Sequence, residues 1–233
     1  MPDALPVVLV PGLTCSARLY AEQIPALWRF GPVIVADHTR DDSMASIARR
    51  ILAGAPPRFA LAGLSMGGYI AFEIMRQAPQ RVARLALLDT GARAETPEQT
   101  ERRKVVIALA KSGRYAEVPD IAFPIYVHRN RLNDADLKRT VRMMAEETGV
   151  DAFLRQQQAI MSRPDSRPGF SSIKCLTLVL VGDGDEATPP ELAREIAGAI
   201  TGARLVMIAD CGHLSTLEQP EKVTAALVDW MKW

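Results

Sequence analysis

Short runs of apolar residues recur along the chain and alternate with stretches whose apolar residues follow a helical spacing. The runs cover residues 6–10, 32–36, 58–62, 82–88, 176–181 and 205–209. Continuous apolar runs of this length are typical of strands that are buried on both faces. Because such strands alternate with helical patterns, the sequence predicts βαβ units. We therefore expect an α/β fold with a mostly parallel sheet of about six strands and helices on both faces.

The spacing of the runs divides the chain into a core and an insertion. The first four runs end at residue 88, and the last two follow a long gap that carries only helical patterns. An all-helical insertion between two strands of a parallel sheet is best explained as a cap. We therefore predict a core formed by residues 1–93 and 171–233, and a helical cap (lid) formed by residues 94–170.

Proline and glycine positions divide the expected cap. Thr96 and the proline after it are typical of a helix start, and Gly113 is suited to end that helix. Pro119 and Pro124 are expected to break the following chain into short pieces. Apolar residues that recur on one face predict two further helices, over residues 133–149 and 151–162.

Composition and charge narrow the class of protein. The 233 residues are 48% hydrophobic, which is enough for a sizeable core in one domain. The net charge is +1 with both signs interspersed, so neither nucleic acid nor a membrane is an expected partner. The chain has no run long enough to span a bilayer, and its N-terminus has no basic region ahead of the first apolar run. Three scattered cysteines form neither a disulfide framework nor a metal-binding spacing, so we expect a reduced, cytoplasmic protein without a metal.

A glycine-rich motif follows the third apolar run. Residues 63–68 read Gly-Leu-Ser-Met-Gly-Gly and precede a helical stretch. G-x-S-x-G between a strand and a helix is typical of a nucleophile elbow, a tight turn that exposes the serine above the sheet. Glycines are needed there because neighbouring backbones leave no room for a Cβ. The motif is short enough to arise by chance, so Ser65 becomes a candidate nucleophile only if a base and an acid follow it.

The histidine that follows the last apolar run is the candidate base. A serine hydroxyl needs an adjacent base to take its proton, and the base needs a third group to orient it. In hydrolases with this elbow the chain order is serine, acid, histidine. Only His213 has the right place in this order, because His38 and His128 stand earlier in the chain. A loop after the last strand also lies at the sheet edge where ligands bind in open α/β sheets.

The acid is expected at the carboxyl end of the fifth apolar run. Residues 182–185 read Gly-Asp-Gly-Asp, and spacing alone does not rank Asp185 above Asp183. Asp89, at the end of the fourth run, is a third candidate. Aspartate is equally suited to helix capping and turns, so all three have a structural alternative.

An oxyanion hole needs backbone N–H groups aimed at the carbonyl oxygen where charge develops. One is expected from Met66, the residue after the candidate nucleophile. The other is expected from the loop after the first apolar run, residues 11–15, where Gly12 allows close approach and Leu13 presents its N–H.

Together these residues resemble the α/β-hydrolase fold superfamily over nearly the whole chain. Four segments carry the resemblance: residues 8–13, 63–68, 181–189 and 211–220. The resemblance implies Asp185 as the acid, with Asp183 as the alternative. Two features depart from the family pattern. Pro11 stands where the family has a histidine, and the chain starts at what would be the family's third strand.

The resemblance implies a cofactor-free, carboxylesterase-like serine hydrolase. Such an enzyme cleaves carboxylic esters, or a related lactone or thioester, through an acyl-enzyme with a triad of Ser65, His213 and Asp185. The expected substrate is a small molecule. Apolar cap residues are expected to contact it, namely Phe123, Tyr126, Met144 and Phe153.

Two alternatives remain open. A looser resemblance to pimeloyl-carrier-protein methyl ester esterases implies an acyl-carrier protein as partner, for which basic cap residues are available: Arg102, Arg103, Lys104, Arg129, Arg131, Lys138 and Arg139. A non-hydrolytic member of the fold is the other alternative, as a ligand receptor, an acyltransferase or a cofactor-free lyase.

Overall fold

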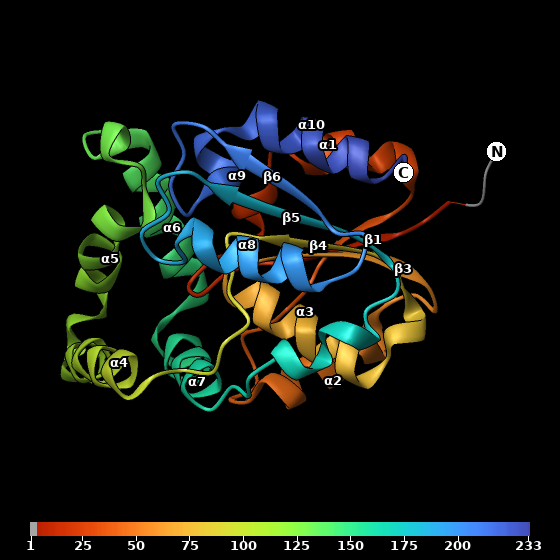
Figure 1. The fold of residues 1–233 in the computed structure, drawn as a ribbon. Helices are drawn as coiled ribbons and strands as arrows, with labels where there is room; N and C mark the ends of the chain where they lie inside the picture. The colour runs from red at the N-terminus through yellow and green to blue at the C-terminus, as the bar shows by residue number, and fades with distance from the viewer. Residues whose placement is uncertain (1–3) are drawn as a thin grey trace.

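A six-stranded parallel sheet forms the centre of the molecule in the computed structural model, which describes residues 4–233 (Figure 1). The strand order is β2-β1-β3-β4-β5-β6. Every neighbouring pair runs parallel, which confirms the fold class that the apolar runs predict. The strands are β1 (Val7–Val10), β2 (Val33–Val35), β3 (Phe59–Leu64), β4 (Val82–Leu88), β5 (Leu176–Gly182) and β6 (Arg204–Ile208).

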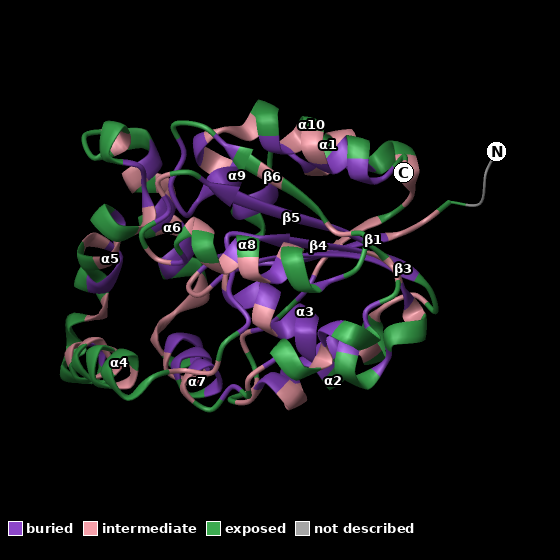
Figure 2. Ribbon diagram, viewed as in Figure 1, coloured by how far each residue is buried: buried purple, intermediate pink, exposed green. Residues whose placement is uncertain are grey.

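Alternate residues of each strand face opposite sides of the sheet. In β1, Val8 and Val10 pack in one apolar cluster, and Val7 and Leu9 pack in the other. The first cluster is covered by α2 (Met44–Gly54), α3 (Met66–Gln77) and α8 (Pro190–Ala199). The second is covered by α1 (Ile24–Leu27) and α10 (Pro220–Trp230). Figure 2 shows the inner strands β1, β3, β4 and β5 as a mostly buried layer between these helices, whereas β2 and β6 lie at the sheet edges and are more exposed. Burial on both faces explains why the inner strands read as unbroken apolar runs.

Four helices lie between β4 and β5 and gather at one end of the sheet (Figure 1). They are α4 (Pro97–Leu109), α5 (Val118–Tyr126), α6 (Ala135–Thr148) and α7 (Val150–Met161). We call residues 97–161 the helical segment. Parallel strands end at a common edge, so this segment lies beside the loops that follow the strands. Over residues 4–233, the chain forms no helix that is both long and apolar enough to cross a bilayer.

Short helical turns complete the fold. The 3₁₀ turns are η1 (Ala17–Tyr20), η2 (Trp28–Phe30), η3 (Pro79–Arg81), η5 (Tyr115–Glu117), η6 (Arg129–Arg131) and η7 (Arg167–Ser172). A π turn, η4 (Ala110–Arg114), follows α4, and a one-turn helix, α9 (Ser215–Glu218), precedes α10.

The helix ends follow local chemistry, with two corrections. Thr96 and Gln99 form a reciprocal capping box at the start of α4, and Gly149 ends α6 with a φ of 78°. The expectation that Pro119 and Pro124 break the chain is wrong, because α5 contains both. Pro119 lies in the first turn, where backbone N–H groups have no acceptor within the helix, so a missing N–H costs nothing. Pro124 lies near the end of α5, where its missing N–H removes one hydrogen bond.

Gly113 also plays a different part from the one expected. It adopts a φ of 85° inside the turn that joins α4 to the next 3₁₀ turn, whereas α4 itself ends at Leu109. The left-handed conformation, which glycine adopts at no steric cost, redirects the chain toward α5.

Candidate active site

Ser65 lies in a tight turn between β3 and α3. Its φ of 56° is one that a non-glycine residue rarely adopts, so the turn is strained and must be fixed by its surroundings. A Cβ at Gly63 would overlap the Gly67 carbonyl, and a Cβ at Gly67 would overlap the carbonyl oxygen of Val10. Both positions therefore require glycine, as the sequence motif implies.

Backbone hydrogen bonds hold this turn against the end of β4. The Ser65 N–H donates to the Leu88 carbonyl at 3.0 Å. The Ser65 carbonyl accepts from Thr90 Oγ1 at 2.8 Å and from the Gly68 N–H at 2.9 Å. These three bonds fix the serine backbone without using its side chain, which stays free for chemistry.

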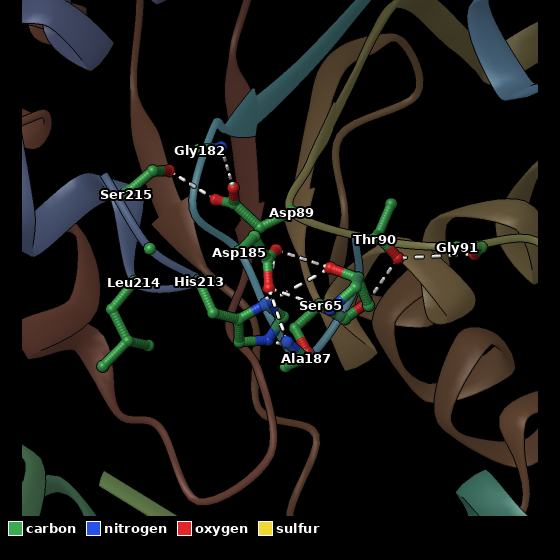
Figure 3. Close-up of polar contacts among 12 residues, drawn as sticks. Ser65, Asp89, Thr90, Gly91, Gly182, Asp185, Ala187, His213, Leu214 and Ser215 are labelled. Carbon is green, nitrogen blue, oxygen red and sulfur yellow. Dashed lines mark hydrogen bonds and ion pairs between the residues drawn. The ribbon is translucent and has the colours of Figure 1, made fainter. Parts of the chain in front are cut away.

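Ser65, His213 and Asp185 form a continuous hydrogen-bonded line (Figure 3). His213 Nε2 lies 2.8 Å from Ser65 Oγ, and His213 Nδ1 lies 2.8 Å from Asp185 Oδ2. The side chains come from the loops after β3, β6 and β5, which meet at the same edge of the sheet. Because Nδ1 faces a carboxylate, it carries the hydrogen, and Nε2 is left to accept a proton from Ser65.

The Asp185 carboxylate is held in place by the loop that precedes α8. Oδ1 accepts the backbone N–H groups of Ala187 at 2.9 Å and Thr188 at 2.8 Å. Oδ2 accepts Thr188 Oγ1 at 2.7 Å as well as His213. Asp185 is buried, with 3% of its surface exposed, so these four bonds replace its hydration. The hydrogen bonds from Thr188 to Asp185 could not be predicted from the sequence, because they depend on how the loop between β5 and α8 folds.

The other two candidate acids lie elsewhere. Asp183 is exposed, and its Oδ1 accepts the Cys211 N–H at 3.2 Å. Asp89 is fully buried, accepts the Gly182 N–H at 2.9 Å and also accepts the Ser215 hydroxyl. Burial, with the nearby charge of Asp185 second, holds the pKa of Asp89 well above its usual range. Neither carboxylate makes a hydrogen bond to His213.

His213 is buried beside this charge. Burial alone would lower its pKa, but the Asp185 carboxylate, through its charge and its hydrogen bond, raises the pKa above the ordinary histidine value. A histidine with a raised pKa that faces a serine hydroxyl is suited to act as a general base.

Glu218 holds the loop that carries His213. Its Oε1 accepts the N–H groups of Gly212 at 3.0 Å and Leu214 at 3.2 Å, the two residues that flank His213. Its Oε2 accepts the His128 N–H at 2.7 Å, and His128 follows α5. One buried carboxylate therefore ties the histidine loop to the helical segment. The sequence shows Glu218 as part of a family motif but not this role.

The two expected oxyanion donors lie beside Ser65, Met66 as the next residue of the chain and Leu13 on the loop that follows β1. Met66 is the first residue of α3, and a Cβ built on Gly12 would lie 3.4 Å from Ser65 Cβ, so the 11–15 loop touches the nucleophile turn. Within residues 4–233, neither Leu13 nor Met66 donates its backbone N–H to a protein acceptor. Both donors thus remain available to a ligand.

A pocket of about 220 Å³ opens between the helical segment and the 11–15 loop. Its lining is mainly apolar and includes the charged residues Glu95, Arg102 and Arg103. Leu13 and Tyr126 line it, whereas Ser65 and His213 do not. Tyr126 bridges the two regions, since its ring packs on His213 with centroids 5.3 Å apart. The pocket therefore adjoins the Ser65–His213 pair without containing it.

The four cap residues expected to contact substrate separate into two pairs. Tyr126 and Phe153 line the pocket. Phe123 and Met144 do not line it, and they pack in the apolar cluster on the α1 and α10 face of the sheet. A helical apolar face serves a core and a pocket equally well, so the sequence pattern does not separate the two pairs.

No group of three or more His, Cys, Asp or Glu side chains suited to a metal ion occurs between residues 4 and 233. Cys15 and Cys211 are buried near the site, and burial raises the pKa of the Cys15 thiol to about 12. A thiol of that pKa stays protonated at neutral pH and is a poor nucleophile.

A model of the alpha/beta hydrolase family matches residues 7–227, and the chain belongs to that family. The match spans all six strands, the candidate triad and the helical segment. Family membership and the hydrolases among the relatives support an enzyme of the hydrolase class.

Three relatives illustrate the range of the family. The chain is 31% identical over 185 residues to BpoC of Mycobacterium tuberculosis, which is named as a non-heme bromoperoxidase, and the match covers 75% of this chain and 67% of BpoC. The structure of a thermophilic esterase from Thermogutta terrifontis superposes with a TM-score of 0.88 and 29% identity, over 98% of this chain and 89% of the esterase. The structure of an enol-lactonase from Burkholderia xenovorans LB400 superposes with a TM-score of 0.87 and 25% identity, over 99% of this chain and 92% of the enol-lactonase.

Proposed function

We propose that this protein is a serine hydrolase that cleaves carboxylic esters or lactones through an acyl-enzyme. The observation that carries the proposal is the line of 2.8 Å contacts from Ser65 Oγ through the His213 imidazole to Asp185. A serine in a strained strand-to-helix turn, a buried base and a fully bonded acid are the parts that acyl transfer needs.

The chemistry follows from these positions. Ser65 Oγ attacks the ester carbonyl while His213 Nε2 takes the hydroxyl proton. The Leu13 and Met66 N–H groups donate to the oxygen that becomes negative. The C–O bond then breaks, and His213 returns the proton to the leaving alcohol. A water molecule, activated by His213, attacks the acyl-enzyme and releases the acid and Ser65. Asp185 stays ionised and stabilises the imidazolium at each step.

The helical segment acts as the cap in this proposal. The pocket beneath it is mainly apolar, so one part of the substrate is an apolar group small enough for about 220 Å³. An ester or lactone of this kind agrees with the esterase and the enol-lactonase among the structural relatives.

A free small-molecule ester is favoured over an ester carried by an acyl-carrier protein. Five of the seven basic cap residues already form ion pairs with acidic side chains. The pairs are Arg103–Glu95, Lys104–Glu101, Arg131–Asp134, Lys138–Asp120 and Arg139–Asp136. Charges neutralised in this way leave a weaker field for an acidic protein partner.

Hydrolysis of p-nitrophenyl acetate, butyrate and octanoate tests the proposal, with Ser65→Ala as the matched inactive variant. We expect turnover by the wild type and loss of nearly all of it in Ser65→Ala. A fluorophosphonate probe should label the wild type and not the variant, because it reacts only with an activated serine. Absence of both turnover and labelling would contradict the proposal and favour a non-hydrolytic member of the fold. Turnover that Ser65→Ala retains would contradict the assignment of the nucleophile.

A further inference from the structure

The oxyanion loop has an unusual support. Pro11 precedes Gly12, so the loop carries no polar side chain at that position. A histidine from a different part of the chain approaches instead. His38 follows β2, is 2% exposed, and places Nε2 at 2.9 Å from the Gly12 carbonyl oxygen. A carbonyl oxygen only accepts, so Nε2 carries the hydrogen and donates it.

The His38 hydrogen bond is made to the peptide group that joins Gly12 to Leu13. The Gly12 carbonyl and the Leu13 N–H belong to the same planar unit, and in a trans peptide the two bonds point in opposite directions. Fixing the oxygen on one side therefore fixes the direction of the N–H on the other. The Cys15 N–H also donates to this oxygen, at 3.1 Å, and closes a turn. The His38 bond adds an anchor from outside the loop.

We propose that His38 is a positioning residue for the oxyanion hole, which it serves by holding the Gly12–Leu13 peptide so that the Leu13 N–H faces the reacting carbonyl. The proposal rests on the proposed function of Ser65. A hydrogen bond to the carbonyl also polarises the peptide and makes its N–H a stronger donor. His38 thus acts through the backbone and does not touch the substrate.

The surroundings of His38 suit this role. Burial lowers its pKa, and the hydrogen bond to Gly12 and the nearby Asp37 offset this only in part. The ring is therefore neutral at neutral pH and brings no competing charge to the oxyanion. The loop that carries it is fastened on both sides. The Ala36 N–H donates to the Leu9 carbonyl at 2.8 Å, and Arg155 of α7 donates to the Thr39 carbonyl at 2.9 Å.

A matched control exists two peptides earlier in the chain. The Tyr20 hydroxyl donates to the Val10 carbonyl at 3.0 Å, and Tyr20 is fully buried. The nitrogen of that peptide belongs to Pro11, which has no N–H. The two buried bonds therefore secure the same stretch of backbone, but only the His38 bond orients a donor. Tyr20→Phe should weaken the fold without disturbing the oxyanion hole.

The test compares His38→Leu, His38→Gln and Tyr20→Phe by kcat and KM on a p-nitrophenyl ester and by inhibition with a trifluoromethyl ketone. The ketone forms a tetrahedral adduct with the serine, so its affinity reports the oxyanion hole. Loss of a complete oxyanion donor costs about 100- to 1,000-fold, so a misdirected donor should cost about 10- to 100-fold.

We expect His38→Leu to lower kcat by that factor, to leave KM within about twofold, and to weaken ketone binding in parallel. His38→Gln retains an N–H donor and should recover most of the activity. Tyr20→Phe should lower the melting temperature and leave kcat unchanged. Unchanged kcat in His38→Leu, or equal losses in His38→Leu and Tyr20→Phe, would overturn the proposal.

A spectroscopic measurement separates this proposal from the function of the site. The amide resonance of Leu13, in protein labelled with ¹⁵N-leucine, reports the polarisation of the Gly12–Leu13 peptide without any turnover. We expect it to shift in His38→Leu and to stay in place in Tyr20→Phe, and an unmoved resonance would overturn the proposal. A wild type that neither hydrolyses esters nor reacts with the fluorophosphonate would instead reject the proposed function.

Discussion

The ring of Tyr126 packs on the imidazole of His213, with ring centroids 5.3 Å apart and an interplanar angle of 34°. The same residue accepts the backbone N–H of His213 through its carbonyl oxygen, at 3.0 Å. Tyr126 ends α5 and also lines the pocket. Tyr126 therefore both lines the pocket and contacts the candidate base, His213.

Tyr126→Leu is expected to lower kcat/KM by about 2- to 10-fold, because an aromatic contact of this kind contributes about 0.5–1.5 kcal/mol. Steady-state kinetics on p-nitrophenyl butyrate measure the loss. Tyr126→Phe keeps the ring and should remain close to the wild type. Equal losses in the two variants would place the effect on the hydroxyl and not on the ring.

The two neighbouring aspartates are expected to differ sharply. Asp185→Asn removes the carboxylate that faces His213 Nδ1 and should lower kcat on the order of 10³- to 10⁴-fold. Asp183→Asn changes an exposed side chain that contacts Cys211 and should retain most of the activity. Kinetics on both variants decide the matter, and a larger loss in Asp183→Asn would reject Asp185 as the acid.

Ester hydrolysis is expected to rise with pH through the titration of His213, since only the neutral imidazole accepts the serine proton. Asp185 raises the pKa of His213, so the midpoint of the kcat/KM profile should lie above the ordinary value of about 6.5. Removing that charge should move the titration to lower pH. Imidazole NMR titrations of Ser65→Ala, with and without Asp185→Asn, measure this directly. If Asp185→Asn leaves the midpoint of the His213 titration unchanged, the Asp185 carboxylate is not what raises the pKa of His213.

Glu218→Gln is expected to destabilise the fold by about 1–3 kcal/mol, because a buried carboxylate that accepts three backbone N–H groups loses one acceptor oxygen. Urea unfolding measures the change. Glu221→Gln, an exposed change in the next helix, should stay within about 0.5 kcal/mol of the wild type. A Glu218→Gln variant as stable as the control would show that the histidine loop does not depend on this carboxylate.

Filling the pocket should select against long acyl groups. Val106 of α4 lines the pocket, whereas its neighbour Val105 is 70% exposed and does not line it. Val106→Trp is expected to lower kcat/KM for p-nitrophenyl octanoate at least tenfold more than for the acetate. Val105→Trp should leave the ratio of the two unchanged. If Val106→Trp also leaves it unchanged, the apolar part of the substrate binds elsewhere.

The regular parts of this molecule could be predicted because local patterns determine them. The apolar runs predict all six strands, and for the inner four the reason is that parallel strands buried on both faces show no polar alternation. Ser65 could be singled out because the glycines around it are required by backbone contact. His213 could be singled out by its place after the last strand. These features depend on residues that are close together in the chain.

Other parts depend on contacts that local sequence does not record. Asp183 and Asp185 are two residues apart, and the direction of each side chain depends on the turn between β5 and α8. Pro124 lies inside α5 although prolines usually end helices, because it stands near the end of the helix, where the missing N–H removes one hydrogen bond. His38 reaches Gly12 from a different βα loop, a contact between residues 26 positions apart in the chain.

Backbone bonds join the end of α5 to the histidine loop. The Tyr126 carbonyl accepts the N–H groups of both His213 and Leu214, and Glu218 accepts the N–H of His128. By contrast, α4 contributes no fully buried residue to the fold. Any motion that lifts α5 would displace the base as well. We therefore expect substrate to enter by a movement of α4, while α5 and the loop that carries His213 keep their positions.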